Sequence, residues 1–402
     1  MAQDESALEV VRLRRFVLIV ALVALGTKLL IAATTFGTND VFHWEEFAKG
    51  VRRVGPIAVY GQHFTAVFNH PPPIPFLLMA VNALADRGVP FPFLIRLPAC
   101  LADLGSALLV FELLRTRRSP RSAAVIAALV ALSPVLMVIS GFHGNTDPVF
   151  VFLALLSFYL LVDRDAPIAA GVAFGFSIGV KVVPIVALPV MLVSARKPKQ
   201  LMRFAGALVI TLVITWTPTL LREFSAVRTN VFGYPGPARN QWGIVLFLRG
   251  LGSPHVVLTF VPGPGRFLIL AAAALIPAYL ARRHPEAAME AFAMSIPLFL
   301  LLTPAFGPHY LVWAAVLVYL VEPWTGTAYN LAAGALLVWT YTEWSGGFPW
   351  YRAHAGPLDG VGVALGIVAW LALLACLLLG VQIVRGRLRR HDSVLVSQKQ
   401  PV

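Results

Sequence analysis

Residues 16–46 read FVLIVALVALGTKLLIAATTFGTNDVFHWEE, and this stretch decides the fold of the chain. Its first part, 16–35, is an apolar run long enough for a helix to cross a bilayer, which takes about 20 residues. The run is too long for the apolar core of a cleavable signal and has no clear A-x-A cleavage site. We therefore expect a membrane anchor that ends at the water boundary, next to the carboxylate of Asp40.

The composition extends this expectation to the whole chain. Of the 402 residues, 58% are hydrophobic and 13% are charged, whereas a soluble domain carries about 25% charged residues. Several further apolar runs reach the length of a membrane span, and a helix satisfies its own backbone hydrogen bonds in lipid. The sequence therefore predicts an all-α polytopic membrane protein, with one transmembrane domain over residues 1–390 and a disordered cytoplasmic tail over 391–402.

We expect about twelve transmembrane helices. The expected spans are 16–36, 93–114, 122–141, 148–162, 166–181, 183–195, 201–221, 266–281, 287–303, 309–322, 327–344 and 360–384. Those between residues 148 and 195 are short, and Pro184 and Pro189 interrupt the last of them. Broken helices are tolerated in a membrane where they line a cavity or pack on protein, so we expect one of these environments here.

The positive charge orients the spans. The net charge is +13, and five clusters of Arg and Lys stand beside apolar segments, at 12–15, 115–121, 196–203, 282–283 and 385–390. With about twelve crossings all five fall on one side, which predicts cytoplasmic N- and C-termini in a plasma membrane. Membrane lipids are the expected partners of these charges, and nucleic acid is not, because there is no soluble basic domain. The two cysteines, Cys100 and Cys376, lie in apolar stretches and exclude a disulfide framework.

Two long loops are expected on the outer side, at about 37–92 and 222–265. Within the first, Asp40–Val54 has the pattern of an amphipathic interfacial helix. Its apolar positions are Val41, Trp44, Phe47, Ala48 and Val51. The apolar stretch Ile74–Leu84 is too short to span and is expected to lie in the membrane interface. Asn69-His70-Pro71-Pro72-Pro73 between them is expected to be extended, because proline disfavours helix before it.

Unusual polar residues gather at four outer edges: Asn39-Asp40, the turn 141–148 (GFHGNTDP), Lys181, and 306–313 (FGPHYLVW). An ionisable residue at membrane depth is costly, so it is functional or paired by default. No His, Cys, Asp or Glu set has metal-ligand spacing, and no P-loop or nucleophile elbow is present, so neither a metal nor a cofactor is predicted.

Each of these residues also has a plainer interpretation. Asp40 and Asp147 could each cap the start of a helix, the latter with Pro148 at the first helical position. Lys181 could extend to the outer headgroups. His309 could be an interfacial histidine bonded to a backbone carbonyl, and His70 could be an ordinary loop residue.

The order and side of these motifs resemble the C-type (GT-C) glycosyltransferases, polytopic enzymes that use polyprenyl-phosphate sugars. The resemblance runs from about Val17 to Leu320. Asp40 matches an acidic residue after the first span, within a long first outer loop. The remaining matches follow in chain order: Asn69-His70-Pro71-Pro72 to N-x-P-P, Gly144-Asn145-Thr146-Asp147 to G-Q-x-D, Lys181 with Pro184 to K-x-x-P, and Gly307–Trp313 to a late Q-Y-L-x-W stretch.

The resemblance implies a membrane glycosyltransferase that moves a hexose or pentose from a polyprenyl-phosphate donor to a lipid or glycan acceptor at the outer face. Asp40 would be the catalytic base of an inverting displacement. The expected cations for the donor phosphate are Lys181, Arg222 and Arg228. The expected substrate-binding residues are Asn39, His70, His143, Asn145, Asp147, His309 and Tyr310. No metal is implied for a lipid-linked donor of this kind.

Two other classes of function stay open. A lipid-linked sugar flippase or proton-coupled transporter would use Asp147 and Lys181 as coupling residues. No inverted repeat is visible, and the large amphipathic outer loop also argues against transport. An inert scaffold subunit would explain the spans, but it would leave the polar outer motifs without a role.

Overall fold

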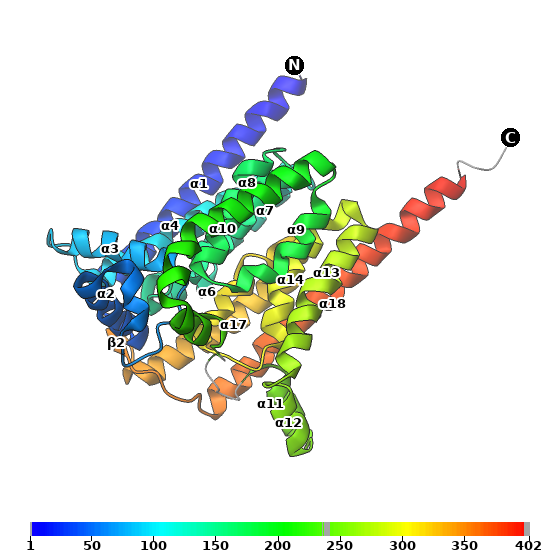
Figure 1. The fold of residues 1–402 in the computed structure, drawn as a ribbon. Coiled ribbons are helices and arrows are strands. Elements are labelled where there is room, and N and C mark those ends of the chain that lie inside the picture. The colour runs from blue at the N-terminus through cyan, green and yellow to red at the C-terminus, as the bar shows by residue number, and fades with distance from the viewer. Residues whose placement is uncertain (1, 235, 237–241, 398–402) are drawn as a thin grey trace.

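The computed structural model describes residues 2–234, 236 and 242–397, which form a bundle of helices (Figure 1). The first helices are α1 (Ala2–Thr34), α2 (Asn39–Ala58), η1 (Val59–Gly61), α3 (Pro73–Ala85), α4 (Phe91–Leu114), α5 (Pro120–Ala131), α6 (Pro134–Val138), η2 (Ile139–His143), α7 (Asp147–Val162), α8 (Pro167–Val180), η3 (Val183–Ala187) and α9 (Leu188–Ser194). The others are α10 (Pro198–Val227), η4 (Arg228–Phe232), α11 (Gly243–Gly250), α12 (His255–Phe260), α13 (Gly265–Arg283), η5 (Pro285–Ala287), α14 (Ala288–Leu302), η6 (Pro308–Leu311), α15 (Val312–Ala315), α16 (Val318–Val321), α17 (Pro323–Ser345) and α18 (Gly360–Ser397).

The predicted all-helical fold is confirmed. Within the described part of the chain, seven helical segments are long and apolar enough to cross a membrane: Ala7–Thr34, Phe91–Leu114, Pro120–His143, Pro198–Phe232, Gly265–Arg283, Pro285–Leu302 and Gly360–Gly386. The other expected spans are also helical, but four of them are shorter, and α17 is not among the seven. The total of twelve crossings therefore stays a prediction.

The two ends of the chain extend from the same side of the bundle. The first turns of α1 and the last turns of α18 project there, whereas α2 and α3 lie at the opposite side (Figure 1). The tail that was expected to be disordered from residue 391 is helical as far as Ser397, because α18 continues past its apolar span. Residues 398–402 lie outside the described residues.

The amphipathic helix predicted in the first loop is present as α2. All five of its predicted apolar positions are buried, and the face that they form packs against α3 and α10. α3 buries Ile74 and Leu78 but exposes Phe76, Met79 and Leu84 on its other side. An apolar exposed face on a short outer helix is compatible with a position in the membrane interface, which stays a prediction.

Arg96 of α4 donates hydrogen bonds to the ends of two helices, α1 and η2. Its fully buried guanidinium donates from Nη2 to the carbonyl oxygens of Thr35 (2.6 Å) and Phe36 (3.1 Å), just after α1. From Nη1 it donates to the carbonyls of Gly141 (2.9 Å) and Phe142 (3.3 Å) in η2. The last carbonyls of a helix have no partner within the helix, so one buried cation satisfies both ends and holds them side by side.

Two glycines allow the backbones to approach at this point. Gly37 has φ +104°, and a Cβ there would lie 2.6 Å from the carbonyl oxygen of Phe142. Gly144 has φ +87°, and its Cβ would lie 2.3 Å from Cγ2 of Val41. The strand β1 (Gly37–Thr38) then pairs in parallel with β2 (Arg352–Ala353). These contacts fix the start of α2 against the end of η2.

We predict that Arg96→Met lowers the stability of the fold by roughly 3 kcal/mol or more, because several buried carbonyls lose their donor. The measurement is thermal unfolding of the purified protein in detergent. The matched control is Arg52→Met, since Arg52 pairs with Asp86 at 2.7 Å but both side chains are more than half exposed. That variant should lose less than about 1 kcal/mol. Equal unfolding temperatures for the two variants would show that the Arg96 contacts do not hold the fold.

Candidate functional site

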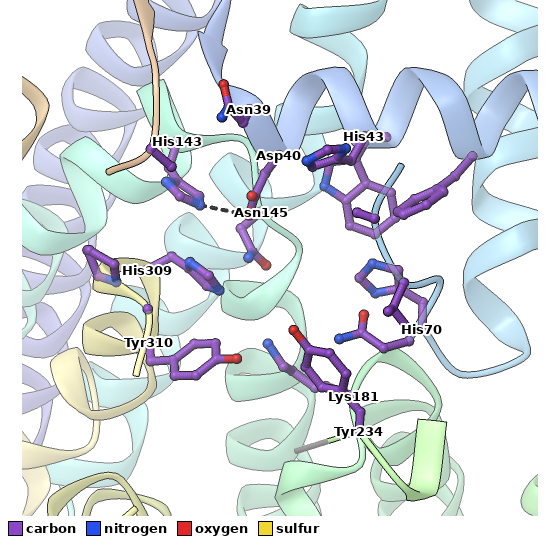
Figure 2. A pocket seen from close by; sticks show the side chains of 18 of the residues that line it. Asn39, Asp40, His43, His70, His143, Asn145, Lys181, Tyr234, His309 and Tyr310 are labelled. Carbon is purple, nitrogen blue, oxygen red and sulfur yellow. Dashed lines mark hydrogen bonds and ion pairs between the residues drawn. The ribbon is translucent and has the colours of Figure 1, made fainter. Parts of the chain in front are cut away.

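A polar cavity of about 330 Å³ lies between the start of α2, the loop before α3, the end of η2 and the segment leading into η6 (Figure 2). It gathers most of the site residues predicted from the sequence: Asn39, Asp40, His70, His143, Asn145, Lys181, His309 and Tyr310. Asp40 and Lys181 lie on opposite sides of it (Figure 2). Residues from five separate segments therefore converge on one cavity, as a binding site requires.

Asp40 faces His143 across the upper part of the cavity. Its Oδ2 lies 2.9 Å from Nε2 of His143, and its side chain stays 35% exposed to the cavity. Burial acts to raise the pKa of the Asp40 carboxyl, but the charge and hydrogen bond of His143 outweigh it, so the net pKa lies below its ordinary value. The interpretation of Asp40 as a helix cap is wrong, because Thr38 is the cap and accepts from the Asp40 N–H.

His143 has a second partner that the sequence did not indicate. The Oη of Tyr341 in α17 lies 2.6 Å from Nδ1 of His143, across 198 residues of sequence. The ring of His309 stacks on His143 with centroids 4.7 Å apart. Among the described residues, His309 contacts the rings of His143 and Tyr310, and its predicted hydrogen bond to a backbone carbonyl stays a prediction.

Asp40, His143 and His309 each offer one ligand atom, and these atoms all lie within 4.8 Å of one another. Sequence spacing could not indicate this group, because its members come from three separate segments. The rings of the two histidines are stacked and only 29° from parallel. Since the nitrogen lone pairs lie in the ring planes, the two rings do not aim at a common point about 2 Å from both. The side chains as they stand do not fit a metal ion.

Lys181 is held by Asp147 and two aromatic rings. Its Nζ lies 2.8 and 2.9 Å from the two carboxylate oxygens of Asp147, and it also lies over the rings of Tyr310 and Trp313. Trp313 Nε1 donates to Asp147 at 2.6 Å. Asp147 therefore does not cap α7, and Lys181 does not extend to the headgroups, so both plainer interpretations are wrong. Lys181 remains 26% exposed and presents its ammonium to the cavity.

The ring of His70 lies in the wall of the cavity opposite His143 and His309 (Figure 2). The His70 ring stacks on Trp44 with centroids 4.1 Å apart and contacts Phe47 and Phe68. Burial, with a smaller contribution from the charge of Lys181, lowers the pKa of His70 to about 3, so the imidazole is neutral near pH 7. Tyr60 donates to the His70 carbonyl at 2.6 Å. His70 is therefore a fixed part of an aromatic wall and not an ordinary loop residue.

An apolar groove of about 340 Å³ adjoins the cavity. The two share Asn69, His70, Lys181, Tyr234 and Tyr310. Beyond this junction, the groove runs between η3 and α13, where its apolar walls are Val182, Val183, Ile185, Val186, Phe267, Ile269 and Leu270. The broken helix predicted around Pro184 therefore lines a cavity, as expected.

Two of the predicted phosphate-binding cations, Arg222 and Arg228, lie outside both the cavity and the groove. Arg222 and Arg228 are exposed, and neither is among the residues that line the cavity or the groove. Arg266 at the start of α13 lines the groove instead. Its position at the outer end of an expected span was the available signal, but sequence alone does not tell which of several outer arginines faces a groove.

Comparison with known proteins agrees with the resemblance predicted from the motifs. Residues 69–220 match the family model described as dolichyl-phosphate-mannose-protein mannosyltransferase. A stretch of 94 residues is 29% identical to GPI mannosyltransferase 1 of Candida albicans (strain SC5314 / ATCC MYA-2876). That match covers 23% of this chain and 23% of the length of the yeast protein. The family match includes Asn69, Asn145, Asp147 and Lys181, whereas Asp40 and His309 lie outside it.

Proposed function

We propose that this protein is an integral membrane glycosyltransferase that moves a hexose or pentose from a polyprenyl-phosphate donor to a hydroxyl group of a lipid or glycan acceptor. Mannose is the favoured sugar, because the matching family model and the similar Candida albicans protein are both named as mannosyltransferases. One observation carries the proposal. A carboxylate and an ammonium face each other across a polar cavity, and the cavity opens beside the ammonium into an apolar groove.

The shape of the combined site suits a lipid-linked donor. The groove between η3 and α13 would take the polyprenyl chain, because its walls are almost entirely apolar side chains. The phosphate would then lie at the junction, where Lys181 can donate charge-assisted hydrogen bonds to it. The sugar would extend into the polar cavity toward Asp40. Asn69, Tyr234 and Tyr310 line the junction and offer further polar contacts.

Asp40 supplies the base. As the acceptor oxygen bonds to C1 of the sugar, its proton passes to the Asp40 carboxylate, and the C1–O bond to the phosphate breaks with its electron pair on the phosphate. The phosphate is a stable anion, so Lys181 has only to stabilise its charge and no acid is needed. Because the two groups lie on opposite sides of the cavity, attack and departure would occur on opposite faces of C1, which gives inversion.

We also propose that the site lies at the outer face of a plasma membrane and that the chain crosses this membrane about twelve times. The site lies at the side of the bundle that carries α2 and α3, away from the N-terminal end of α1 and the C-terminal end of α18. By the positive-inside rule, the basic clusters at 12–15 and 385–390 favour a cytoplasmic position for those two ends. The exposed apolar face of α3 suits a helix in the outer interface.

We predict that Asp40→Asn lowers kcat for sugar transfer by roughly 10²-fold or more, because the base is lost while its size is kept. The measurement is transfer from a polyprenyl-phosphate mannose to acceptor lipid by the purified protein. The control is Glu45→Gln on the same helix, since Glu45 does not line the cavity. Near-normal transfer by Asp40→Asn would refute the assignment of the base.

We predict that Lys181 carries the affinity for the donor phosphate. Removing Lys181 alone would leave Asp147, 2% exposed, without its cation, so the test variant is Lys181→Gln with Asp147→Asn, which keeps the site neutral. Its KM for the donor should rise about tenfold or more, as expected for loss of a charged hydrogen bond. Lys181→Arg keeps the charge and should lose less. An unchanged donor KM in the double variant would exclude the phosphate role, and Arg266 would then be the next candidate.

We predict that the cavity faces away from the cytoplasm. His63 in the first loop and Thr116 between α4 and α5 are both exposed. A cysteine at position 63 should react with an impermeant thiol reagent in intact cells, and one at position 116 should react only after the membrane is opened. The native Cys100 and Cys376 are buried and give little background. Labelling in the reverse pattern would place the site on the cytoplasmic side.

A further inference from the structure

The imidazole of His143 joins the proposed base to a buried tyrosine. Nε2 lies 2.9 Å from Oδ2 of Asp40, and Nδ1 lies 2.6 Å from Oη of Tyr341. The side chain of His143 is 4% exposed, and Tyr341 is completely buried. Both ring nitrogens of His143 are therefore occupied by a defined partner.

The chemistry of the three groups sets the direction of these hydrogen bonds. An ionised carboxylate can only accept, so Nε2 of His143 must carry the hydrogen that it donates to Asp40. The hydroxyl of Tyr341 can donate to Nδ1 of a neutral imidazole or accept from Nδ1–H of a protonated one, so it is a partner for the ring in either state. Tyr341 has no other hydrogen-bond partner among the described residues. Its hydroxyl is thus placed to hold the ring of His143 in one orientation.

The surrounding backbone holds this arrangement in place. Thr38 Oγ1 donates to the carbonyl of His143 at 2.8 Å, one residue beyond the carbonyls bound by Arg96. Phe142 packs on the ring of Tyr341, with centroids 5.4 Å apart. The three groups come from α2, η2 and α17 and cannot easily move apart.

We propose that His143 and Tyr341 are positioning residues for Asp40. The Tyr341 hydroxyl holds the ring of His143 in place, and the Nε2–H then holds Oδ2 of Asp40 and leaves Oδ1 for the acceptor hydroxyl. The inference rests on the proposed function. In the step itself, the acceptor proton moves to Asp40 as the new O–C1 bond forms and the bond to phosphate breaks, while His143 and Tyr341 keep their protons. In enzymes generally, a base that activates a nucleophile is oriented by a third group in the same way.

The proposal gives Tyr341→Phe a specific kinetic signature. Without the hydroxyl, the ring of His143 loses one of its two partners and can turn away from Asp40. The carboxylate is then held less often in the productive orientation, so the chemical step slows. The groove and Lys181, which are proposed to bind the donor, are unchanged. The kcat of the variant should therefore fall while its donor KM stays the same.

The experiment measures kcat and the donor KM for sugar transfer by full-length protein, as the ratio of each variant to wild type. Tyr341→Phe should lose about tenfold or more in kcat with an unchanged donor KM. The matched control is Tyr329→Phe: Tyr329 is also buried in α17, but its hydroxyl donates to the carbonyl of Leu311 at 2.7 Å. Its kcat should fall much less. His143→Gln keeps an N–H donor, so it should retain more activity than His143→Leu.

Three results would overturn the positioning role. One is a kcat for Tyr341→Phe that is unchanged from wild type or lowered no more than in Tyr329→Phe. Another is His143→Gln no more active than His143→Leu. The third is one bound transition-metal ion per wild-type protein that is lost in His309→Ala, because His143 would then be a ligand. Active Asp40→Asn would instead defeat the proposed function itself, whereas inactive Asp40→Asn with normal Tyr341→Phe would defeat only the positioning role.

Discussion

The site depends on the hydrogen bonds that the buried guanidinium of Arg96 donates to backbone carbonyls. A chain that ends one helix and turns sharply into the next leaves carbonyl groups without partners, and burying them unpaired is costly. Arg96 satisfies such carbonyls from α1 and from η2 with one side chain. Asp40 follows the first of these segments closely, and His143 ends the second. The hydrogen bond between them is therefore a consequence of the way α4 joins the two backbones.

Two further buried or partly buried cations, Lys28 and Lys181, are each paired with a carboxylate. Lys28 and Asp103, each 2% exposed, meet at 2.7 Å between α1 and α4, the same helices that Arg96 connects. Lys181 and Asp147 meet in the same manner beside the cavity. A buried pair adds little net stability, but loss of one member is costly, so such pairs favour one register of helices over others. The first pair lies away from the cavity and fixes α1, and the second presents its ammonium where the cavity meets the groove.

The proposed donor and acceptor ends of the site come from different parts of the chain. Residues 69–220, which resemble mannosyltransferases, carry Lys181, Asp147 and the apolar residues of η3, so this segment builds the junction and one wall of the groove. Asp40 comes from before that segment, and His309 and Tyr341 come from after it. The matched segment thus carries the proposed phosphate-binding lysine, whereas the proposed base and the residues around it lie outside that segment.

The sequence by itself determined the long helices, the buried face of α2 and eight of the residues that line the cavity. These features depend on local properties: apolar length, a period of 3.6 residues, and the cost of placing a polar side chain beside lipid. Only the tertiary structure decided which partner each polar group finds. Asp147 could equally have capped α7, but packing placed Lys181 and Trp313 within its reach. Tyr341 carried no polar signal within its apolar helix, yet it meets His143 across 198 residues. Arg222 and Arg228 have the right charge, but the direction in which a helix faces is set by long-range packing, and here they face outward.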